Sequence, residues 1–169
     1  RIATLYEGTT GIQALDLLGR KVLMMTRGGA VREFTLRMSN EARKHLTDST
    51  LRPWAWRILK LATQWNWLTF RLMVIARKDR DMVSAAAHDF LMYSGYVYMA
   101  FMWLRMAAVA RQGLEKGGNQ SEEFYRSKLA TAEFYFDRML PQAQGHAESM
   151  LSPSETLMQL DNEAFAFDY

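Results

Sequence analysis

The sequence predicts an all-α protein, an antiparallel bundle of about five long helices followed by a short C-terminal helix. The chain of 169 residues holds only three prolines and ten glycines, so long stretches contain nothing that breaks a helix. Apolar residues recur every three or four positions in five segments, and no segment of useful length alternates as a strand would. Hydrophobic residues make up 49% and charged residues 23%, which is typical of a globular domain.

The first two helices are predicted at residues 10–26 and 30–46. Thr9 or Thr10 is a suitable N-cap for the first, and Gly28 and Gly29 provide its stop. The apolar stripe expected to be buried in the first helix consists of Ile12, Leu15, Leu18, Val22 and Met25. The corresponding stripe of the second helix consists of Val31, Phe34, Met38 and Ala42.

The third helix is predicted to begin near Pro53, which is favourable in a first helical turn. One apolar face comprises Ile58, Leu61, Ala62, Trp65, Leu68, Leu72 and Ile75. A second comprises Trp56, Leu59, Trp67, Phe70 and Val74. Because a surface helix normally has one apolar face, two faces predict a helix in the interior of the bundle.

The fourth helix is predicted at residues 81–112, with Gly113, Gly117 and Gly118 ending it. Residues 90–110 are apolar on almost every side and are long enough to span a bilayer. Arg105 lies within this stretch, however, and an arginine in a membrane helix costs about 3 kcal/mol. The sequence therefore predicts a buried central helix rather than a membrane span, and membrane association is not the expected role.

The fifth helix is predicted to start with Ser121 as its N-cap and to kink or end at Pro141. Residues 152–155 read Ser-Pro-Ser-Glu, a capping box that predicts a short helix to about residue 160. The acidic and aromatic tail, residues 161–169, is expected to dock on the protein rather than to form a helix.

Charge divides unevenly along the chain. Residues 1–80 carry 15 lysines and arginines against 6 acids, whereas residues 81–169 carry 6 against 12. The simplest interpretation is that basic and acidic helices face each other within one domain. No recognition motif accompanies the basic half, so we expect no nucleic-acid partner. With no cysteine and three scattered histidines, no metal site is expected.

A polar loop precedes the first helix. Its sequence is Tyr6-Glu7-Gly8-Thr9-Thr10-Gly11-Ile12-Gln13, which places a carboxylate between an aromatic ring and a glycine. A carboxylate partly desolvated by Tyr6 would have a raised pKa and could act as a general base. On the pattern alone, an ordinary helix start with a nearby acid is the favoured explanation of the loop.

This loop resembles the Tyr-Glu-Gly-Thr-x-x-Ile-Gln segment of acyl-CoA dehydrogenases, flavoproteins that oxidise acyl-CoA thioesters to trans-2-enoyl-CoA. The resemblance extends through the following helix, residues 14–21, and so covers about 20 residues. The later helices look like the extra C-terminal domain of a longer branch of this family, which includes the 3-methylmercaptopropionyl-CoA dehydrogenases. Phe134-Tyr135-Phe136, near Pro141, suits the last long helix of that domain.

The resemblance implies specific roles for the loop residues. Glu7 corresponds to the catalytic base that removes the α-proton of the thioester. Thr9 and Gln13 fall where the family contacts FAD, and Tyr6 and Gly8 fall in the substrate-binding segment. Many members have a polar residue where this chain has Gly11, which removes one potential contact to the flavin.

The resemblance also implies an organisation and a set of partners. Residues 1–28 would form the active-site loop and last helix of the dehydrogenase core, and residues 29–169 the additional helical domain. A cytoplasmic homodimeric enzyme of fatty acid metabolism, using acyl-CoA and an electron-transfer flavoprotein, is expected. The chain alone is expected to be inactive without upstream domains. The alternative is a non-catalytic helical module for interaction, dimerisation or binding to a membrane surface.

Overall fold

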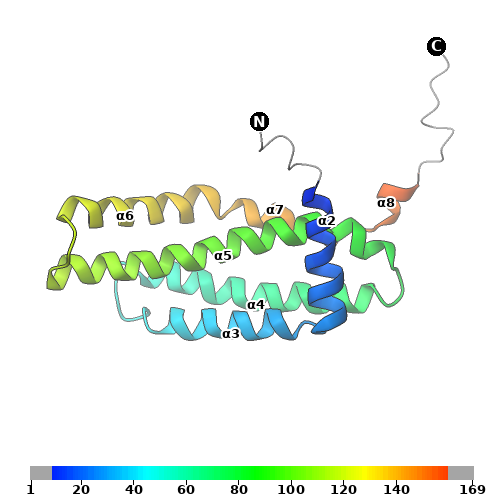
Figure 1. Cartoon of the computed structure of the whole chain (residues 1–169), viewed down its shortest axis with the longest axis horizontal. Helices are drawn as coiled ribbons and strands as arrows, with labels where there is room; N and C mark the ends of the chain where they lie inside the picture. Colours follow the sequence, from blue (N-terminus) through cyan, green and yellow to red (C-terminus); the bar gives the residue numbers. More distant parts are fainter. Residues whose placement is uncertain (1–8, 160–169) are drawn as a thin grey trace, which may run out of the picture.

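The computed structural model describes residues 9–159, and no strand occurs among them. Nine helical segments follow one another, of which two are π-helical and labelled η (Figure 1). They are α2 (Thr10–Leu15), η2 (Asp16–Met25), α3 (Gly29–Arg43), α4 (Arg52–Ile75), α5 (Asp81–Lys116), α6 (Glu122–Phe134), η3 (Tyr135–Met139), α7 (Gln142–Ser149) and α8 (Glu155–Met158). Since α2 and η2 form one continuous rod, the prediction of an all-α bundle with five long helices and a short last one is confirmed.

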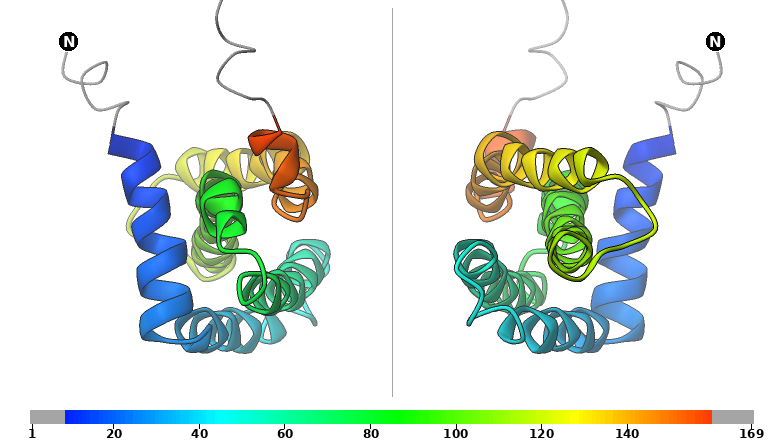
Figure 2. Two further views of the ribbon diagram at one scale, coloured as in Figure 1. Left: turned by 90° about the vertical axis from the view of Figure 1, so that its right-hand side faces the viewer. Right: turned by 90° about the vertical axis from the view of Figure 1, so that its left-hand side faces the viewer.

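The bundle is built around α5. Helices α3 and α4 lie side by side in one layer, and α6, η3 and α7 cover the opposite side of α5 (Figure 1). The rod of α2 and η2 crosses the bundle steeply along one flank (Figure 2). Phe90, Tyr93 and Leu104 of α5 are fully buried, which confirms the central position predicted for this helix. No helix between residues 9 and 159 has the length and apolar character needed to cross a membrane.

Helix α5 extends four residues beyond its predicted end and stops at the second of the three predicted glycines. The helix passes through Gly113 and ends at Lys116, followed by Gly117 with a φ of 77°. Gly113 has a packing role instead, because a Cβ there would lie 2.6 Å from the ring of Tyr125 on α6. Glycine therefore allows α6 to approach the last turns of α5, and the helix stops at the next glycine with a left-handed φ.

Helix α4 confirms one of its two predicted faces. Pro53 lies in the first turn, and the face containing Ile58, Leu68 and Leu72 is buried. The second face is not buried, since Trp56 and Trp67 are 53% and 50% exposed. The prediction of an interior helix is therefore wrong: α3 and α5 pack against one side of α4 and leave the aromatic side at the surface.

Of the two caps predicted for the last helices, one is confirmed and the other is wrong. The Ser121 hydroxyl accepts a hydrogen bond from the backbone N–H of Phe124 at 3.2 Å, as predicted for an N-cap. The expected capping box at residues 152–155 does not form, and α8 starts after Ser154 without a side-chain cap. The Ser154 hydroxyl instead donates to the carboxylate of Asp79, because a tertiary partner is available to it.

Candidate functional site

The predicted site residues divide into two groups. Tyr6, Glu7 and Gly8 lie outside the described residues. Thr9 and Gln13 are described, and both are exposed at the start of α2. The Gln13 amide nitrogen donates to the Thr9 hydroxyl across 3.5 Å, so the structure brings these two side chains together one helical turn apart.

The helix that carries these residues buries a different stripe from the one predicted. Leu18 and Val22 are buried as expected, with Ala14 in line, but Ile12, Leu15 and Met25 are 70%, 42% and 66% exposed. Asp16–Met25 is π-helical, and a π-turn contains more residues than an α-turn. The buried positions therefore repeat every four residues, and the stripe predicted from α-helical spacing drifts away from the core.

The far end of this helix is closed by a left-handed turn. The backbone N–H of Gly28 donates to the carbonyl of Val22 at 2.8 Å, and Gly28 has a φ of 79°. The preceding Arg27 also has a positive φ, of 48°. Midway along, Gly19 approaches Val83 of α5 so closely that an added Cβ would lie 3.4 Å from the valine methyl. These contacts fix the orientation of the rod against α5.

Asp16 is the carboxylate on this rod nearest to Thr9 and Gln13 among the described residues. The Arg20 guanidinium forms a two-point contact with it, and the Lys21 ammonium lies 3.2 Å away. Hydrogen bonding from Arg20 lowers the pKa of Asp16 to about 2, the bond from Lys21 acting in the same direction against partial desolvation. A carboxylate held in its ionised form by two cations is poorly suited to act as a base.

The histidines contact neighbouring side chains within the bundle. No cluster of three or more potential metal ligands exists within residues 9–159. His146 Nδ1 lies 2.8 Å from a carboxylate oxygen of Asp89, which joins α7 to α5. The sequence does not predict this contact, because His146 and Asp89 are 57 positions apart and no motif links them.

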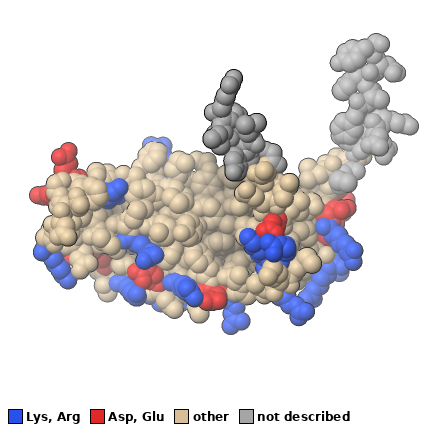
Figure 3. All heavy atoms as spheres, in the orientation of Figure 1, with Lys and Arg blue, Asp and Glu red and all other residues tan. Residues whose placement is uncertain are grey.

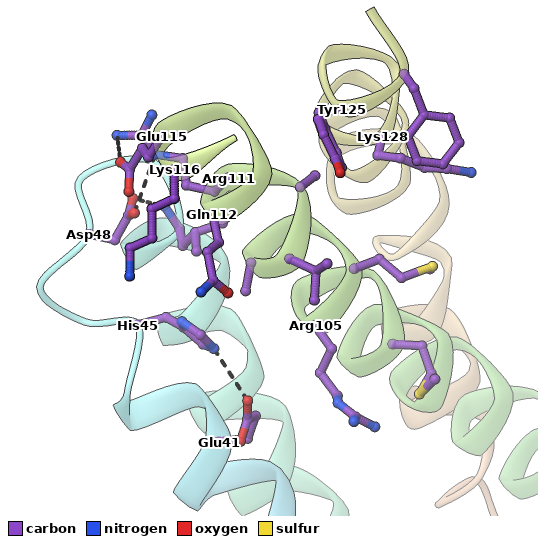
Figure 4. A pocket seen from close by; sticks show the side chains of 17 residues that line it. Glu41, His45, Asp48, Arg105, Arg111, Gln112, Glu115, Lys116, Tyr125 and Lys128 are labelled. Carbon is purple, nitrogen blue, oxygen red and sulfur yellow. Dashed lines mark hydrogen bonds and ion pairs between the residues drawn. The ribbon is translucent and has the colours of Figure 1, made fainter. Parts of the chain in front are cut away.

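A large hollow lies where the α3–α4 connection meets the ends of α5 and α6 (Figure 4). Its volume is about 740 Å³. Arg111 contacts Asp48 at 3.4 Å and Glu115 at 2.9 Å on one wall. Burial opposes ionisation of Asp48, but the backbone N–H groups of Leu51 and Thr50 and the Arg111 charge outweigh it and lower its pKa.

This hollow and the predicted loop are separate features. The rod carrying Thr9 and Gln13 meets α5 near Val83, whereas the hollow includes Arg111 of the same helix. The 28 residues between these positions correspond to about 42 Å of α-helix. Neither Thr9 nor Gln13 lines the hollow.

The chain belongs to the family described as Acetyl-CoA dehydrogenase C-terminal like, whose model matches residues 31–161. It is 28% identical over 158 residues to the 3-methylmercaptopropionyl-CoA dehydrogenase of Ruegeria pomeroyi, covering 94% of this chain and 26% of the relative. It is 29% identical over 174 residues to the broad-specificity linear acyl-CoA dehydrogenase FadE5 of Mycobacterium tuberculosis, covering 98% of this chain and 28% of that protein. No solved structure matches the chain.

The resemblance to a C-terminal acyl-CoA dehydrogenase region is thus confirmed at the level of the family. The chain spans about a quarter of the length of these two relatives. The division into residues 1–28 and 29–169 stays a prediction, as do the roles of the loop residues.

Proposed function

We propose that this chain is the C-terminal region of a flavin-dependent acyl-CoA dehydrogenase. The match of residues 31–161 to the family carries this proposal, and the names of both relatives support it. The motif around Glu7 adds the chemistry, since it resembles the segment that holds the catalytic base. Residues 1–28 then complete an active site formed mainly by the preceding domains, and residues 29–169 form an additional helical domain.

In the proposed reaction, the Glu7 carboxylate takes a proton from the α-carbon of the thioester. The backbone N–H of Glu7 donates a hydrogen bond to the thioester carbonyl and stabilises the negative charge that develops there. Bound FAD supplies the oxidant by accepting the hydride that leaves the β-carbon. Tyr6 and Gly8 border the acyl group, and exclusion of water by Tyr6 keeps the pKa of Glu7 close to the operating pH.

The described residues are chemically compatible with a flavin next to this loop. The Thr9 hydroxyl and the Gln13 amide both expose groups that donate and accept hydrogen bonds, as the polar edge of a flavin requires. On the same short helix, Ile12 and Leu15 expose apolar surface, whereas Ala14, Leu18 and Val22 of the rod are buried. Both features suit a helix that another domain covers.

We expect the whole enzyme to act on acyl-CoA, to pass electrons to an electron-transfer flavoprotein and to form a homodimer in the cytoplasm. The 169-residue chain by itself should be inactive. Neither Thr9 nor Gln13 lines the hollow at the end of α5 or either of two hollows beside α4, so we expect a flavin to be held mostly by other parts of the enzyme.

Replacement of Glu7 in the full-length protein tests the proposed base. Glu7→Gln should abolish reduction of an artificial electron acceptor by acyl-CoA while the flavin absorbance of the purified protein is retained. Glu33→Gln is the matched control, because Glu33 is an exposed residue paired only with Arg37 on α3. Full activity in the Glu7 variant would show that another group removes the proton.

The cofactor contact is tested separately from the chemistry. Gln13→Leu should reduce the FAD content of the full-length enzyme, because the flavin loses a hydrogen-bonding partner. Gln112→Leu, at an exposed position on α5, is the control for a general effect of removing a glutamine. Equal FAD content in both variants and the parent would remove Gln13 from the proposed cofactor site.

A further inference from the structure

A shallow trough follows the exposed face of α4. It is lined by Trp56, Leu59, Lys60, Thr63, Gln64 and Trp67 and has a volume of about 560 Å³. A smaller hollow of about 210 Å³ shares Lys60 and Gln64 with it and extends to α7, where Gln64 donates to Gln144 at 3.2 Å. Two half-exposed tryptophans on a folded surface are a strong indication that another segment binds there.

The trough has a basic end. Arg71 lies above the Trp67 ring, with its guanidinium carbon 5.9 Å from the ring centroid. Arg77 and Lys78 follow just after α4 and are exposed. None of these three, nor Lys60 within the trough, forms an ion pair with any residue between 9 and 159. The surface therefore favours an acidic and aromatic ligand.

A segment of this composition is attached close by. The bond from Ser154 to Asp79 holds the start of α8 next to the turn between α4 and α5. Residues 161–169 then read Asp-Asn-Glu-Ala-Phe-Ala-Phe-Asp-Tyr, with three acids, three aromatic residues and no lysine or arginine. This tail combines the charge and the ring chemistry that complement the trough.

The length of the chain also suffices. Ten residues after Gln159 can span about 33 Å when extended. The eight residues from the end of α4 back to Trp67 rise about 12 Å, and the 19 residues back to Trp56 about 28 Å. Trp67 is therefore within reach of the tail, whereas Trp56 lies near the limit of the extended chain.

We propose that residues 161–169 bind in the α4 trough of their own chain. In an extended segment Phe165, Phe167 and Tyr169 share one side and pack against the exposed tryptophans. Asp161 and Glu163 precede them and lie toward the basic end of α4. The tail thereby covers the aromatic face that the bundle leaves open.

Cysteine crosslinking tests this proposal, because the chain contains no cysteine of its own. The pair Thr63→Cys and Ala166→Cys places one thiol in the trough and one in the tail. Mild oxidation should form an intramolecular disulfide in this variant. The matched control pairs Ala166→Cys with Ser127→Cys, an exposed serine on α6, and should remain reduced. Equal crosslinking of both pairs, or none in the first, overturns the proposal.

The type of product is informative as well. Disulfide-linked dimers in place of the intramolecular product would show that the tail binds a second copy, which also contradicts the proposal. Adding Phe165→Ala and Phe167→Ala to the trough pair should lower the yield of the crosslink several-fold, whereas Asn162→Ala should not. An unchanged yield without the two phenylalanines would show that the rings do not hold the tail. Far-ultraviolet circular dichroism of each variant confirms that the bundle is intact.

Discussion

Two glycines of α5 show that the effect of a residue on stability depends on its neighbours. Gly95 and Gly113 occupy the same helix, and glycine is unfavourable in a helix interior by about 1 kcal/mol relative to alanine. No atom lies within 4 Å of a Cβ built at Gly95, whereas one at Gly113 would lie 2.6 Å from the Tyr125 ring. Tyr125 is itself only 8% exposed, so its ring has little room to move.

Substitution by alanine should therefore have opposite effects at these two sites. Gly95→Ala should raise the free energy of unfolding by about 0.5–1 kcal/mol through helix propensity. Gly113→Ala should lower it by about 1–3 kcal/mol, because overpacking against Tyr125 outweighs the same gain. Urea unfolding of the two variants measures both changes. Stabilisation by Gly113→Ala would contradict the close approach of α6.

Two phenylalanines near the end of α6 form a second matched pair. Phe136 is fully buried, stacks on Trp54 with ring centroids 5.2 Å apart, and lies under the Arg57 guanidinium at 5.6 Å. Phe134, two positions earlier, is 57% exposed. Phe136→Ala should lower the free energy of unfolding by about 3–5 kcal/mol through loss of burial and the cavity left behind.

Phe134→Ala is the control, with an expected change of no more than about 0.5 kcal/mol. Thermal or urea unfolding distinguishes the two variants. Similar losses would mean that Phe134 is covered in solution by something other than the described residues.

At the scale of single elements, caps and π-turns decide where the helices begin and which side they bury. Ser121 could be recognised from the sequence because its cap is local, with an acceptor three residues before its donor. The expected cap near Ser152 failed because Ser154 finds Asp79, which is 75 positions away. The π-helical turns of η2, which packs against α5, likewise are not predicted by the spacing of its apolar residues.

Removing each serine tests this distinction between local and tertiary partners. Ser121→Ala should lower the free energy of unfolding by about 1 kcal/mol, since the N–H of Phe124 loses its acceptor. Ser152→Ala should change it by less than about 0.5 kcal/mol, because Ser152 is exposed and caps no helix. Chemical unfolding followed by circular dichroism measures both. A larger loss for Ser152→Ala would indicate that Ser152 does cap the helix that follows it.

At the scale of the whole molecule, packing across the bundle determines which charged residues pair and how far the tyrosines are buried. The halves of opposite charge meet at few points: Arg57 pairs with Asp137 at 3.1 Å, while Arg111 pairs with Asp48 in the reverse sense. Many of the ion pairs in the described structure instead join residues three or four positions apart. The interpretation that basic and acidic helices face each other is therefore supported, among the described residues, only by the Arg57–Asp137 and Arg111–Asp48 contacts.

The tyrosines between the layers predict a loss of stability at alkaline pH. Burial raises the pKa of Tyr135 to about 12, with a smaller contribution from electrostatic repulsion by Tyr96. Burial also raises the pKa of Tyr93. An unfolded tyrosine ionises near pH 10. Above this pH the unfolded chain binds fewer protons than the folded one, so the free energy of unfolding should fall between about pH 10 and 12.

Urea midpoints measured from pH 8 to 12 test this dependence. Tyr135→Phe should show a shallower decline above pH 10 than the parent, because one group with different folded and unfolded pKa values has been removed. Tyr98→Phe is the control, since Tyr98 is 45% exposed. An identical decline in all three proteins would show that Tyr135 ionises normally.

The sequence by itself determined the helical class, the number of long helices, the central position of α5 and the motif around Glu7 that suggested the family. These properties depend on local spacing and on residue type, which the order of amino acids records directly. Tertiary structure decided which face of α4 remains open, why α5 continues through Gly113 and which side of the first helix is buried. Those outcomes depend on partners far away in the chain, such as Tyr125 for Gly113, and on the wider turn of η2 against α5.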